Sequence, residues 1–333
     1  MSKTKIYFIE RSTDFNNNDL SSFKIGGSEK TLINITNSLA KNQNLEIKVF
    51  NNTQKEIFSN NVQWLNINNI NNLENVDHLI AMSDANLLTL INSNKKYLWS
   101  HSVQPIEKFL RKKQLIPFIK NKPLMILEGD YHFKNRSFFT SFYGKKILKL
   151  APDCDFINTQ IELKKLPNKK AIFTTRSDRN LSFLLECWQS IHKNSHESEL
   201  HINPPYNLND DELKLNIKIR TKSDKSLLIK ELIESRVMLN PGHKGEVFCL
   251  AAEEARELCI PIVTMGYGCL YERVKHNETG YIAKTKKEFI DYTINILNND
   301  NIYLKLKENL INLKGKRTYD KVADDLLKII NEN

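Results

Sequence analysis

Glycine, long apolar runs and paired cysteine motifs are all scarce in this sequence of 333 residues. The longest apolar run, VFCLAA, is far shorter than the ~20 residues that a membrane-spanning helix needs, so we expect no span. The N-terminal MSKTKIYFIE lacks the apolar stretch of a secretory signal and is typical of a first strand. The five cysteines are odd in number and never form C-x-x-C, which disfavours a disulfide framework or a zinc site. These absences predict a globular, cytoplasmic protein with reduced thiols.

The charge balance is strongly basic, with a net charge of +10. A basic surface suits nucleic acid, an anionic membrane face or a phosphate-bearing ligand. The abundance of Asn, Lys and Ile is also typical of an AT-rich genome, which raises the lysine content without any functional demand. We therefore give the charge little weight by itself.

Short strand-like segments alternate with amphipathic helical segments along the chain, which indicates parallel sheets with helical crossovers. After about Asp155 the order begins again, with KAIFTTR as a new first strand. We expect an α/β protein with two doubly wound, Rossmann-like domains that face each other across a cleft. The predicted domains are residues 1–160, on the acceptor side, and residues 161–315, on the donor side, with the linker in IELKKLPNKK. A C-terminal helix over 316–333 could cross back to the first domain.

Five of the ten glycines lie between Gly242 and Gly280, among carboxylates. VMLNPGHKG predicts a strand and a tight turn, followed by a helix that begins near Phe248. Glu246 would stand at the helix entrance and Glu254 about 12 Å further along the axis. Each carboxylate can bind hydroxyl groups, and the helix N-terminus between them favours a phosphate. Hydroxyls at both ends of a diphosphate are the layout of a sugar nucleotide.

The stretch from Glu246 to Gly280 resembles the donor-binding motif of retaining family 4 glycosyltransferases, which have the GT-B fold. It places a second carboxylate eight residues after the first, then PIV at 261–263, GCLYE at 268–272 and Thr279 before the last glycine. IGGSE at 25–29, LWSH at 98–101 and RNL at 179–181 also resemble segments of that family, in the expected order. The resemblance covers about residues 5–290.

The resemblance implies a role for particular residues. Glu246 would contact the donor sugar, Glu254 the ribose, and Arg179 the leaving diphosphate, while His101 would lie near the reacting centre. The remaining implied contacts are those of Arg176 as a second basic residue, of the nucleotide with Gly245, Val247, Phe248, Cys249 and Leu250, and of a phosphate or acceptor with Gly26 and Gly27.

The sequence departs from the family pattern at three positions. Val247 and Cys249 stand where the common motif has glycines, and Thr174 replaces the first member of the usual basic pair. Each residue implied by the family also has a plain structural reading. The glutamates could be solvated helix charges, Arg179 a surface residue, the Gly26–Gly27 pair a tight turn, and His101 a satisfied structural histidine. His132, in LEGDYHFKN, is open between a site residue and a structural one.

Asp153-Cys154-Asp155 has the D-x-D pattern by which another glycosyltransferase fold holds a divalent metal, but it lacks the context of that fold. We interpret it as loop polarity and expect no metal. No cofactor is expected besides a nucleoside-diphosphate sugar as co-substrate.

Two basic stretches with aromatic residues, PIEKFLRKKQLIPFIKNK and HFKNRSFFTSFYGKKILK, remain outside the motif. They fit contact with an anionic bilayer, with basic residues at the headgroups and aromatic residues at the interface. They fit equally well as first-domain helices whose apolar face is core.

Together these features predict a retaining, hexosyltransferase-like enzyme that moves a sugar from a nucleoside diphosphate to an acceptor hydroxyl. The acceptor would be a glycan or a lipid-linked glycan, in bacterial lipopolysaccharide or surface polysaccharide synthesis, with peripheral contact at the inner face of the plasma membrane. One alternative is a basic nucleic-acid-binding protein, which explains the charge but not the Glu-rich motif; under the main hypothesis no nucleic acid is expected. Another alternative is a sugar-nucleotide enzyme of the same fold, such as an epimerase. The donor, the acceptor and the oligomeric state stay open.

Overall fold

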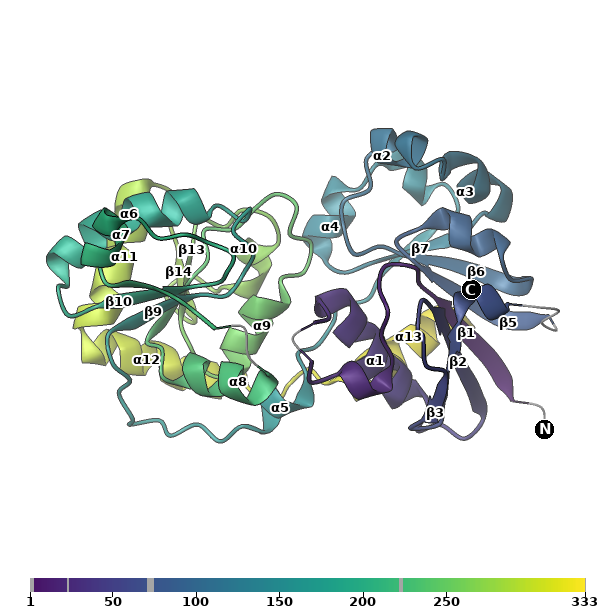
Figure 1. Cartoon of the computed structure of the whole chain (residues 1–333), viewed down its shortest axis with the longest axis horizontal. Coiled ribbons are helices and arrows are strands. Elements are labelled where there is room, and N and C mark those ends of the chain that lie inside the picture. The colour runs from purple at the N-terminus through teal and green to yellow at the C-terminus, as the bar shows by residue number, and fades with distance from the viewer. Residues whose placement is uncertain (1–2, 23, 71–74, 222–223, 333) are drawn as a thin grey trace. The chain divides into compact units, whose positions relative to one another are not determined.

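The computed structural model describes residues 3–22, 24–70, 75–221 and 224–332. The chain forms two compact units, Met1–Ala151 with Arg317–Asn333, and Pro152–Lys316. Each contains a mainly parallel sheet with helical crossovers (Figure 1), so the predicted α/β class with parallel sheets is confirmed. We call them unit 1 and unit 2.

Unit 1 has an eight-stranded sheet in the order β3-β4-β2-β1-β5-β6-β7-β8. All neighbouring strands are parallel except β3 and β4. The strands are β1 (Thr4–Ile9), β2 (Leu45–Asn51), β3 (Ile57–Ser59), β4 (Val62–Asn66), β5 (Val76–Met82), β6 (Ser93–Trp99), β7 (Leu124–Leu127) and β8 (Lys145–Ile147). Residues Trp99 and Ile126 are paired, so β6 and β7 end side by side at the same edge of the sheet.

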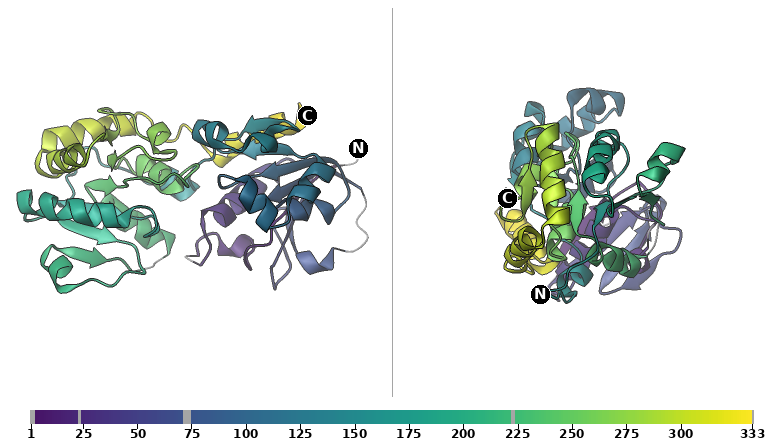
Figure 2. Two further views of the ribbon diagram at one scale, coloured as in Figure 1. Left: turned by 90° about the horizontal axis from the view of Figure 1, so that it is seen from above. Right: turned by 90° about the vertical axis from the view of Figure 1, so that its left-hand side faces the viewer.

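Helices cover this sheet because consecutive side chains of its central strands, which point to opposite faces, are buried. Tyr7 and Ile9 of β1 share a core cluster with Phe109 and Phe118. The helices are α1 (Gly27–Leu39), α2 (Ile106–Arg111), α3 (Leu115–Asn121), α4 (Asp130–Asn135) and α13 (Tyr319–Asn331). The terminal helix α13 packs against α1 (Figures 1 and 2), and the hydroxyl of Tyr319 lies 3.2 Å from Oγ1 of Thr31.

Unit 2 has a six-stranded parallel sheet in the order β11-β10-β9-β12-β13-β14. Its strands are β9 (Lys170–Phe173), β10 (Glu199–Ile202), β11 (Ile217–Ile219), β12 (Val237–Leu239), β13 (Ile262–Thr264) and β14 (Gly280–Ile282). Its helices are α5 (Cys154–Asn158), α6 (Leu181–Asn194), α7 (Asp210–Lys214), α8 (Lys225–Ile233), α9 (Leu250–Glu257), α10 (Leu270–Arg273), α11 (Lys286–Asn298) and α12 (Asp300–Ile311). The central strand β9 lies beside β12, and this pairing brings the start of α6 close to the loop after β12.

The core of unit 2 is built where α6 and α11 pack on the sheet. Trp188 is fully buried there and donates its indole N–H to the carbonyl of Leu215 at 2.9 Å. The ammonium group of Lys307, on α12, donates to the carbonyls of Glu162 and Lys165 at 2.7 and 2.9 Å. These bonds attach the irregular passage before β9 to the body of unit 2.

No helix among the residues described is both long enough and apolar enough to cross a lipid bilayer.

Candidate functional site

The loop between β12 and α9 is held by close backbone contact with the segment that precedes α10. Gly242 and Gly268 both have positive φ, at +88° and +67°. A Cβ on Gly268 would lie only 2.2 Å from the carbonyl oxygen of His243, and one on Gly242 only 2.6 Å from that of Tyr267. Only glycine fits at such distances, so these residues let the two segments touch.

A third glycine, Gly245, leaves room for the guanidinium group of Arg179. A Cβ there would lie 2.9 Å from Nη1 of Arg179. That Nη1 donates to Nδ1 of His243 at 2.7 Å, and the backbone N–H of Gly245 donates to the same nitrogen at 2.9 Å. Because both partners can only donate, Nδ1 of His243 carries no proton. His243 was not predicted from the sequence, although it lies between the two glycines of the turn.

Glu246 follows this turn, and one of its carboxylate oxygens is buried. Its Oε2 has no hydrogen-bond partner among the described residues. Burial raises the pKa of Glu246, while the charge of Arg179 and a bond from Cys249 oppose that rise. The structure thus brings Arg179, His243 and Glu246 together around one turn, with a cation and an unsatisfied acceptor.

The next two residues have buried side chains. Val247 and Phe248 are buried in the core. The helix begins at Leu250, two residues later than the predicted start near Phe248, because Cys249 adopts a left-handed conformation with φ of 61° as the N-cap. Burial raises the pKa of the Cys249 thiol well above its ordinary value.

The other residues predicted to bind the sugar nucleotide, Glu254 and Arg176, differ in their surroundings. Glu254 is half-buried on α9, where its neighbour Glu253 is fully buried and bonds to Arg273 at 2.9 Å. The Arg176 side chain is 71% exposed and forms an ion pair with Asp178 at 2.8 Å. Arg176 thus has a surface ion pair, whereas Arg179 turns into the glycine loop.

In unit 1, Nδ1 of His101 is in close contact with Oε1 of Glu128, and both side chains are largely buried. His101 follows β6 and Glu128 follows the adjacent strand β7, so the sheet places them side by side. The ring contact is made by Nδ1 of His101, and its Nε2 is buried without a partner among the described residues. Glu128 was not predicted from the sequence. Its position at the end of a strand, in Leu127-Glu128-Gly129, marks it as a candidate site residue, but only the order of the strands connects it to His101.

His132 is a structural histidine by its contacts. Its Nδ1 accepts the backbone N–H of Glu128 at 3.3 Å, and its Nε2 lies 3.1 Å from the carbonyl of Ser102. The proton is therefore on Nε2, and the ring connects the loop after β6 to the end of β7. Burial lowers the pKa of His132, against an opposing effect of the Glu128 charge.

Gly26 and Gly27 open the long helix α1, Gly26 as the N-cap and Gly27 as the first residue. Two carboxylates lie beside them. The hydroxyl of Ser12 donates to Glu29 at 3.0 Å, and the backbone N–H of Ser12 donates to Glu10 at 2.5 Å. Burial raises the pKa of Glu10, and the charge of Glu29 adds to that rise. This negative environment suits a hydroxyl donor better than a phosphate.

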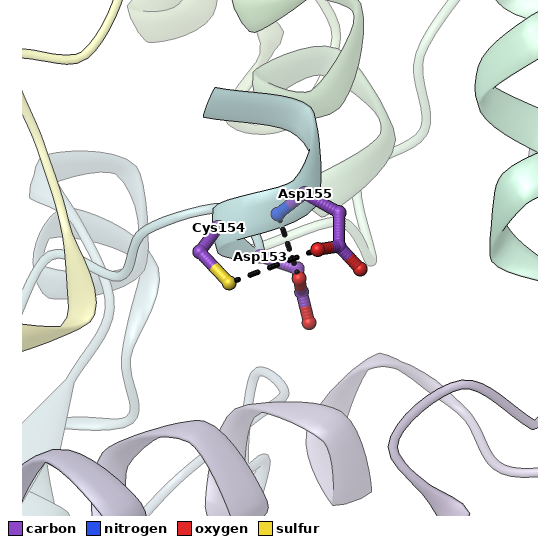
Figure 3. A group of neighbouring side chains, drawn as sticks. All are labelled: Asp153, Cys154 and Asp155. Atoms are coloured by element: carbon purple, nitrogen blue, oxygen red, sulfur yellow. Dashed lines mark hydrogen bonds between the residues drawn. The ribbon is translucent and has the colours of Figure 1, made fainter. Parts of the chain in front are cut away.

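Asp153, Cys154 and Asp155 lie together at the start of α5, with three candidate metal-ligand atoms within 4.8 Å (Figure 3). The ammonium group of Lys225 lies 3.0 Å from Asp153 and 2.6 Å from Asp155. Although burial lowers the pKa of Lys225, bonds to these two carboxylates outweigh that effect and raise it. The lysine thus places one positive charge between the two aspartates.

The chain thus combines two mainly parallel α/β sheets with a glycine loop that places the cation of Arg179 near the unsatisfied carboxylate oxygen of Glu246. Residues 161–313 match the family model described as glycosyl transferases group 1. The prediction of a glycosyltransferase is thereby confirmed. No curated protein matches the sequence.

Three solved structures show the same fold over nearly the whole chain. WaaG, a glycosyltransferase involved in lipopolysaccharide biosynthesis, is 11% identical, with a TM-score of 0.70 over 98% of this chain and 100% of its own. A glycosyltransferase from Rickettsia africae is 15% identical, with a TM-score of 0.71 over 100% and 99%. HepE of Anabaena, in complex with UDP and glucose, is 12% identical, with a TM-score of 0.69 over 99% and 100%. These neighbours confirm the GT-B fold.

Proposed function

We propose that the enzyme transfers a sugar from a nucleoside diphosphate to an acceptor hydroxyl with retention of configuration. The observation that carries this proposal is the turn at Gly245. At this turn, Nη1 of Arg179 lies 2.7 Å from Nδ1 of His243, and Oε2 of Glu246 is buried with no hydrogen-bond partner among the described residues. A cation suits the diphosphate, and an unpaired carboxylate oxygen suits the sugar hydroxyls. UDP is the first nucleotide to test, because HepE was solved with UDP and glucose.

In this mechanism the protein makes no covalent bond to the sugar. The bond between the anomeric carbon and the diphosphate breaks, and the acceptor oxygen attacks from the same face. The acceptor proton passes to the departing diphosphate. Arg179 and the first turn of α9 stabilise the charge that develops on the leaving group. Glu254 would bind the ribose, and Glu246 holds the sugar hydroxyls.

We propose that no divalent metal takes part. Lys225 already lies between the carboxylates of the D-x-D segment, and Arg179 offers the diphosphate a fixed cation. Turnover should therefore be unchanged by EDTA and by added Mg²⁺ or Mn²⁺. A loss of turnover with EDTA that Mn²⁺ restores would contradict this part of the proposal.

The acceptor would bind near Gly26 and Gly27, through hydroxyl groups. The neighbouring carboxylates of Glu10 and Glu29 accept hydrogen bonds from hydroxyls and repel phosphate oxygens. An acceptor glycan of a lipopolysaccharide or surface polysaccharide fits this chemistry, and WaaG has a role in lipopolysaccharide biosynthesis. A panel of glycan acceptors, with the linkage of each product determined, tests this assignment.

A surface on α2, α3 and the short helix at Phe138–Ser141 supports contact with an anionic membrane. Inside it, Phe109, Phe118 and Phe139 pack edge to face, with ring centroids 5.0 to 5.9 Å apart. This aromatic cluster turns the opposite faces of the three elements outward. They expose a set of large apolar side chains, namely Ile106, Leu110, Ile116, Ile119, Phe138 and Phe142. Helices α2 and α3 and the residues that follow each of them carry the exposed basic residues Arg111, Lys112, Lys113, Lys120 and Lys122.

Vesicles of phosphatidylcholine, with and without phosphatidylglycerol, test this contact by cosedimentation. Binding should require the anionic lipid and weaken in salt. Phe138→Ser should weaken it about tenfold or more, because burial of a Phe side chain is worth about 1.5–3 kcal/mol. Phe58→Ser, an equally exposed aromatic on β3, is the matched control and should bind as wild type. Equal binding to both vesicle types would overturn the membrane assignment.

The transfer itself is tested by thermal shift with UDP, GDP, ADP, CMP and their sugar conjugates, followed by product analysis. A nucleotide at about 100 times its Kd should stabilise the protein by about 2.7 kcal/mol. A single hit, with a glycoside as the product, supports transfer. An isomerised sugar nucleotide would indicate an epimerase instead. No shift with any nucleotide, together with salt-sensitive retention of RNA or DNA, would overturn the proposal.

A further inference from the structure

The Glu128–His101 pair in unit 1 has the geometry of a carboxylate that orients a functional histidine. The two residues follow neighbouring parallel strands, and the backbone N–H of Ser100 donates to Ile126 at 3.0 Å, which holds those strand ends in register. The Glu128 side chain is 3% exposed and that of His101 14% exposed. The pair therefore lies on rigid elements rather than on a free loop.

Three further contacts limit the movement of the pair. The backbone N–H of His101 donates to the hydroxyl of Ser83 at 3.1 Å. The ring of Trp99 lies against the imidazole, with centroids 5.0 Å apart. On the other side, His132 accepts the backbone N–H of Glu128 at 3.3 Å. Both members of the pair are thus held from the backbone as well as through their side chains.

The contact with Glu128 decides which ring nitrogen of His101 can meet a ligand. Nδ1 is the ring nitrogen in close contact with Oε1 of Glu128, and an ionised carboxylate can only accept, so we infer that the proton of His101 is on Nδ1. In the neutral ring Nε2 then has a free lone pair, and this nitrogen is buried with no partner among the described residues. A buried acceptor without a donor has a free-energy cost that a bound hydroxyl would remove.

We propose that Glu128 is a positioning residue: it holds His101 in the Nδ1–H tautomer, so that Nε2 accepts a hydrogen bond from a hydroxyl of the sugar substrate. This inference rests on the proposed transfer reaction. His132 takes no part in that hydrogen bond, because both of its nitrogens are engaged by the backbone. The role of Glu128 is to orient the ring, and no bond to the sugar is made or broken by it.

The tautomer can be measured without any turnover. Spectra of the protein labelled with ¹⁵N-histidine should show the His101 ring with its proton on Nδ1, and the signal is assigned by its loss in His101→Asn. In Glu128→Leu the ring should lose this single tautomer. A wild-type ring with the proton on Nε2, or an unchanged ring in the folded variant, would overturn the proposal.

A double-mutant cycle tests the role of the pair in the reaction. Glu128→Gln should lower kcat about 100-fold, since a small misplacement of a substrate-holding group has an effect of that order. KM for the nucleotide sugar and the UDP thermal shift should change little, and Glu128→Asp should restore part of the rate. Because Glu128 acts through His101, Glu128→Gln should have no further effect in a His101→Ala background. Glu197→Gln, an exposed change of the same chemistry, is the control.

The outcomes separate this inference from the proposed function. A folded Glu128→Gln enzyme that binds UDP and keeps wild-type kcat would overturn the positioning role alone. An equal loss in the wild-type and His101→Ala backgrounds would show that Glu128 acts through stability and not through His101. Absence of UDP binding and of turnover in the wild type would overturn the proposed function, while the tautomer measurement would still stand.

Discussion

The two units have the same kind of sheet but hold their polar side chains by different means. In unit 1, His101 and Glu128 come from two separate strand ends and reach each other because β6 and β7 are neighbours. In unit 2, His243 and Glu246 lie in one loop, and glycines bring the backbone close to Arg179. A contiguous loop can be recognised in a sequence, whereas a pair across two strands depends on strand order.

The family match shows the same difference. The model of glycosyl transferases group 1 matches residues 161–313, which lie within unit 2. Structural similarity, in contrast, extends over nearly the whole chain at 11–15% identity. The fold of unit 1 is therefore evident from its coordinates, because many apolar sequences can build a parallel sheet. In unit 2, the backbone crowding at Gly242 and Gly268 allows only glycine at these two positions, so fewer sequences can form its loop.

The largest expected effect compares two glycines with positive φ, one in each unit. In Gly268→Ala the new Cβ would meet the carbonyl of His243 at 2.2 Å, so we expect a loss of about 3 kcal/mol or more in the free energy of unfolding. In Gly144→Ala the nearest atom is 3.6 Å away, on the Leu124 side chain, and the cost should be about 1–2 kcal/mol. Urea denaturation followed by circular dichroism measures both. Equal losses would mean that backbone crowding does not define the unit 2 loop.

A smaller effect distinguishes two arginines of unit 2. Arg179→Gln should lower kcat roughly 10²–10³-fold, because it removes the cation held at His243. Arg176→Gln should change kcat by less than about threefold, since its exposed ion pair with Asp178 contributes little. Initial rates at saturating donor test this, with folding checked by thermal denaturation. Similar losses in the two variants would restore Arg176 as the second phosphate contact.

Glu246 should give a further, moderate loss in turnover. Glu246→Gln removes a charged acceptor and should lower kcat about 10- to 100-fold, with UDP affinity unchanged. Because burial raises the pKa of Glu246 above 4.5, wild-type kcat should fall as the pH drops toward that raised value, and this limb should be absent in the variant. Glu234→Gln, at an exposed position, is the control. A variant with wild-type kcat would remove Glu246 from the mechanism.

The smallest effect concerns the structural histidine of unit 1. Burial lowers the pKa of His132 below 6.5, so the unfolded chain binds a proton more readily than the folded one. Stability from this group is complete above pH 6.5 and is lost as the pH falls through the lowered pKa. His132→Gln should therefore lose less Tm than wild type on acidification, while exposed His196→Gln should follow wild type. Parallel curves for wild type and His132→Gln would contradict this assignment.

Much of the fold was predictable from local patterns. The strand-like segments MSKTKIYFIE and KAIFTTR contain β1 and β9, because short apolar runs of this kind form buried strands. The short strands β3 and β8 were not predicted, since three residues carry too little periodicity. The start of α9 was placed two residues early because a left-handed Cys249 leaves no mark in the hydrophobic pattern.

The sequence by itself determined the alternation of strands and helices, and the glycine-rich stretch from Gly242 to Gly280 with Glu246 and Glu254 eight residues apart. Both follow from neighbours along the chain, where periodicity and backbone freedom act. Only the tertiary structure decided that His243 binds Arg179, that Lys225 pairs with both Asp153 and Asp155, and that Glu128 contacts His101. These contacts join residues from different elements, so they depend on which strands and helices lie side by side.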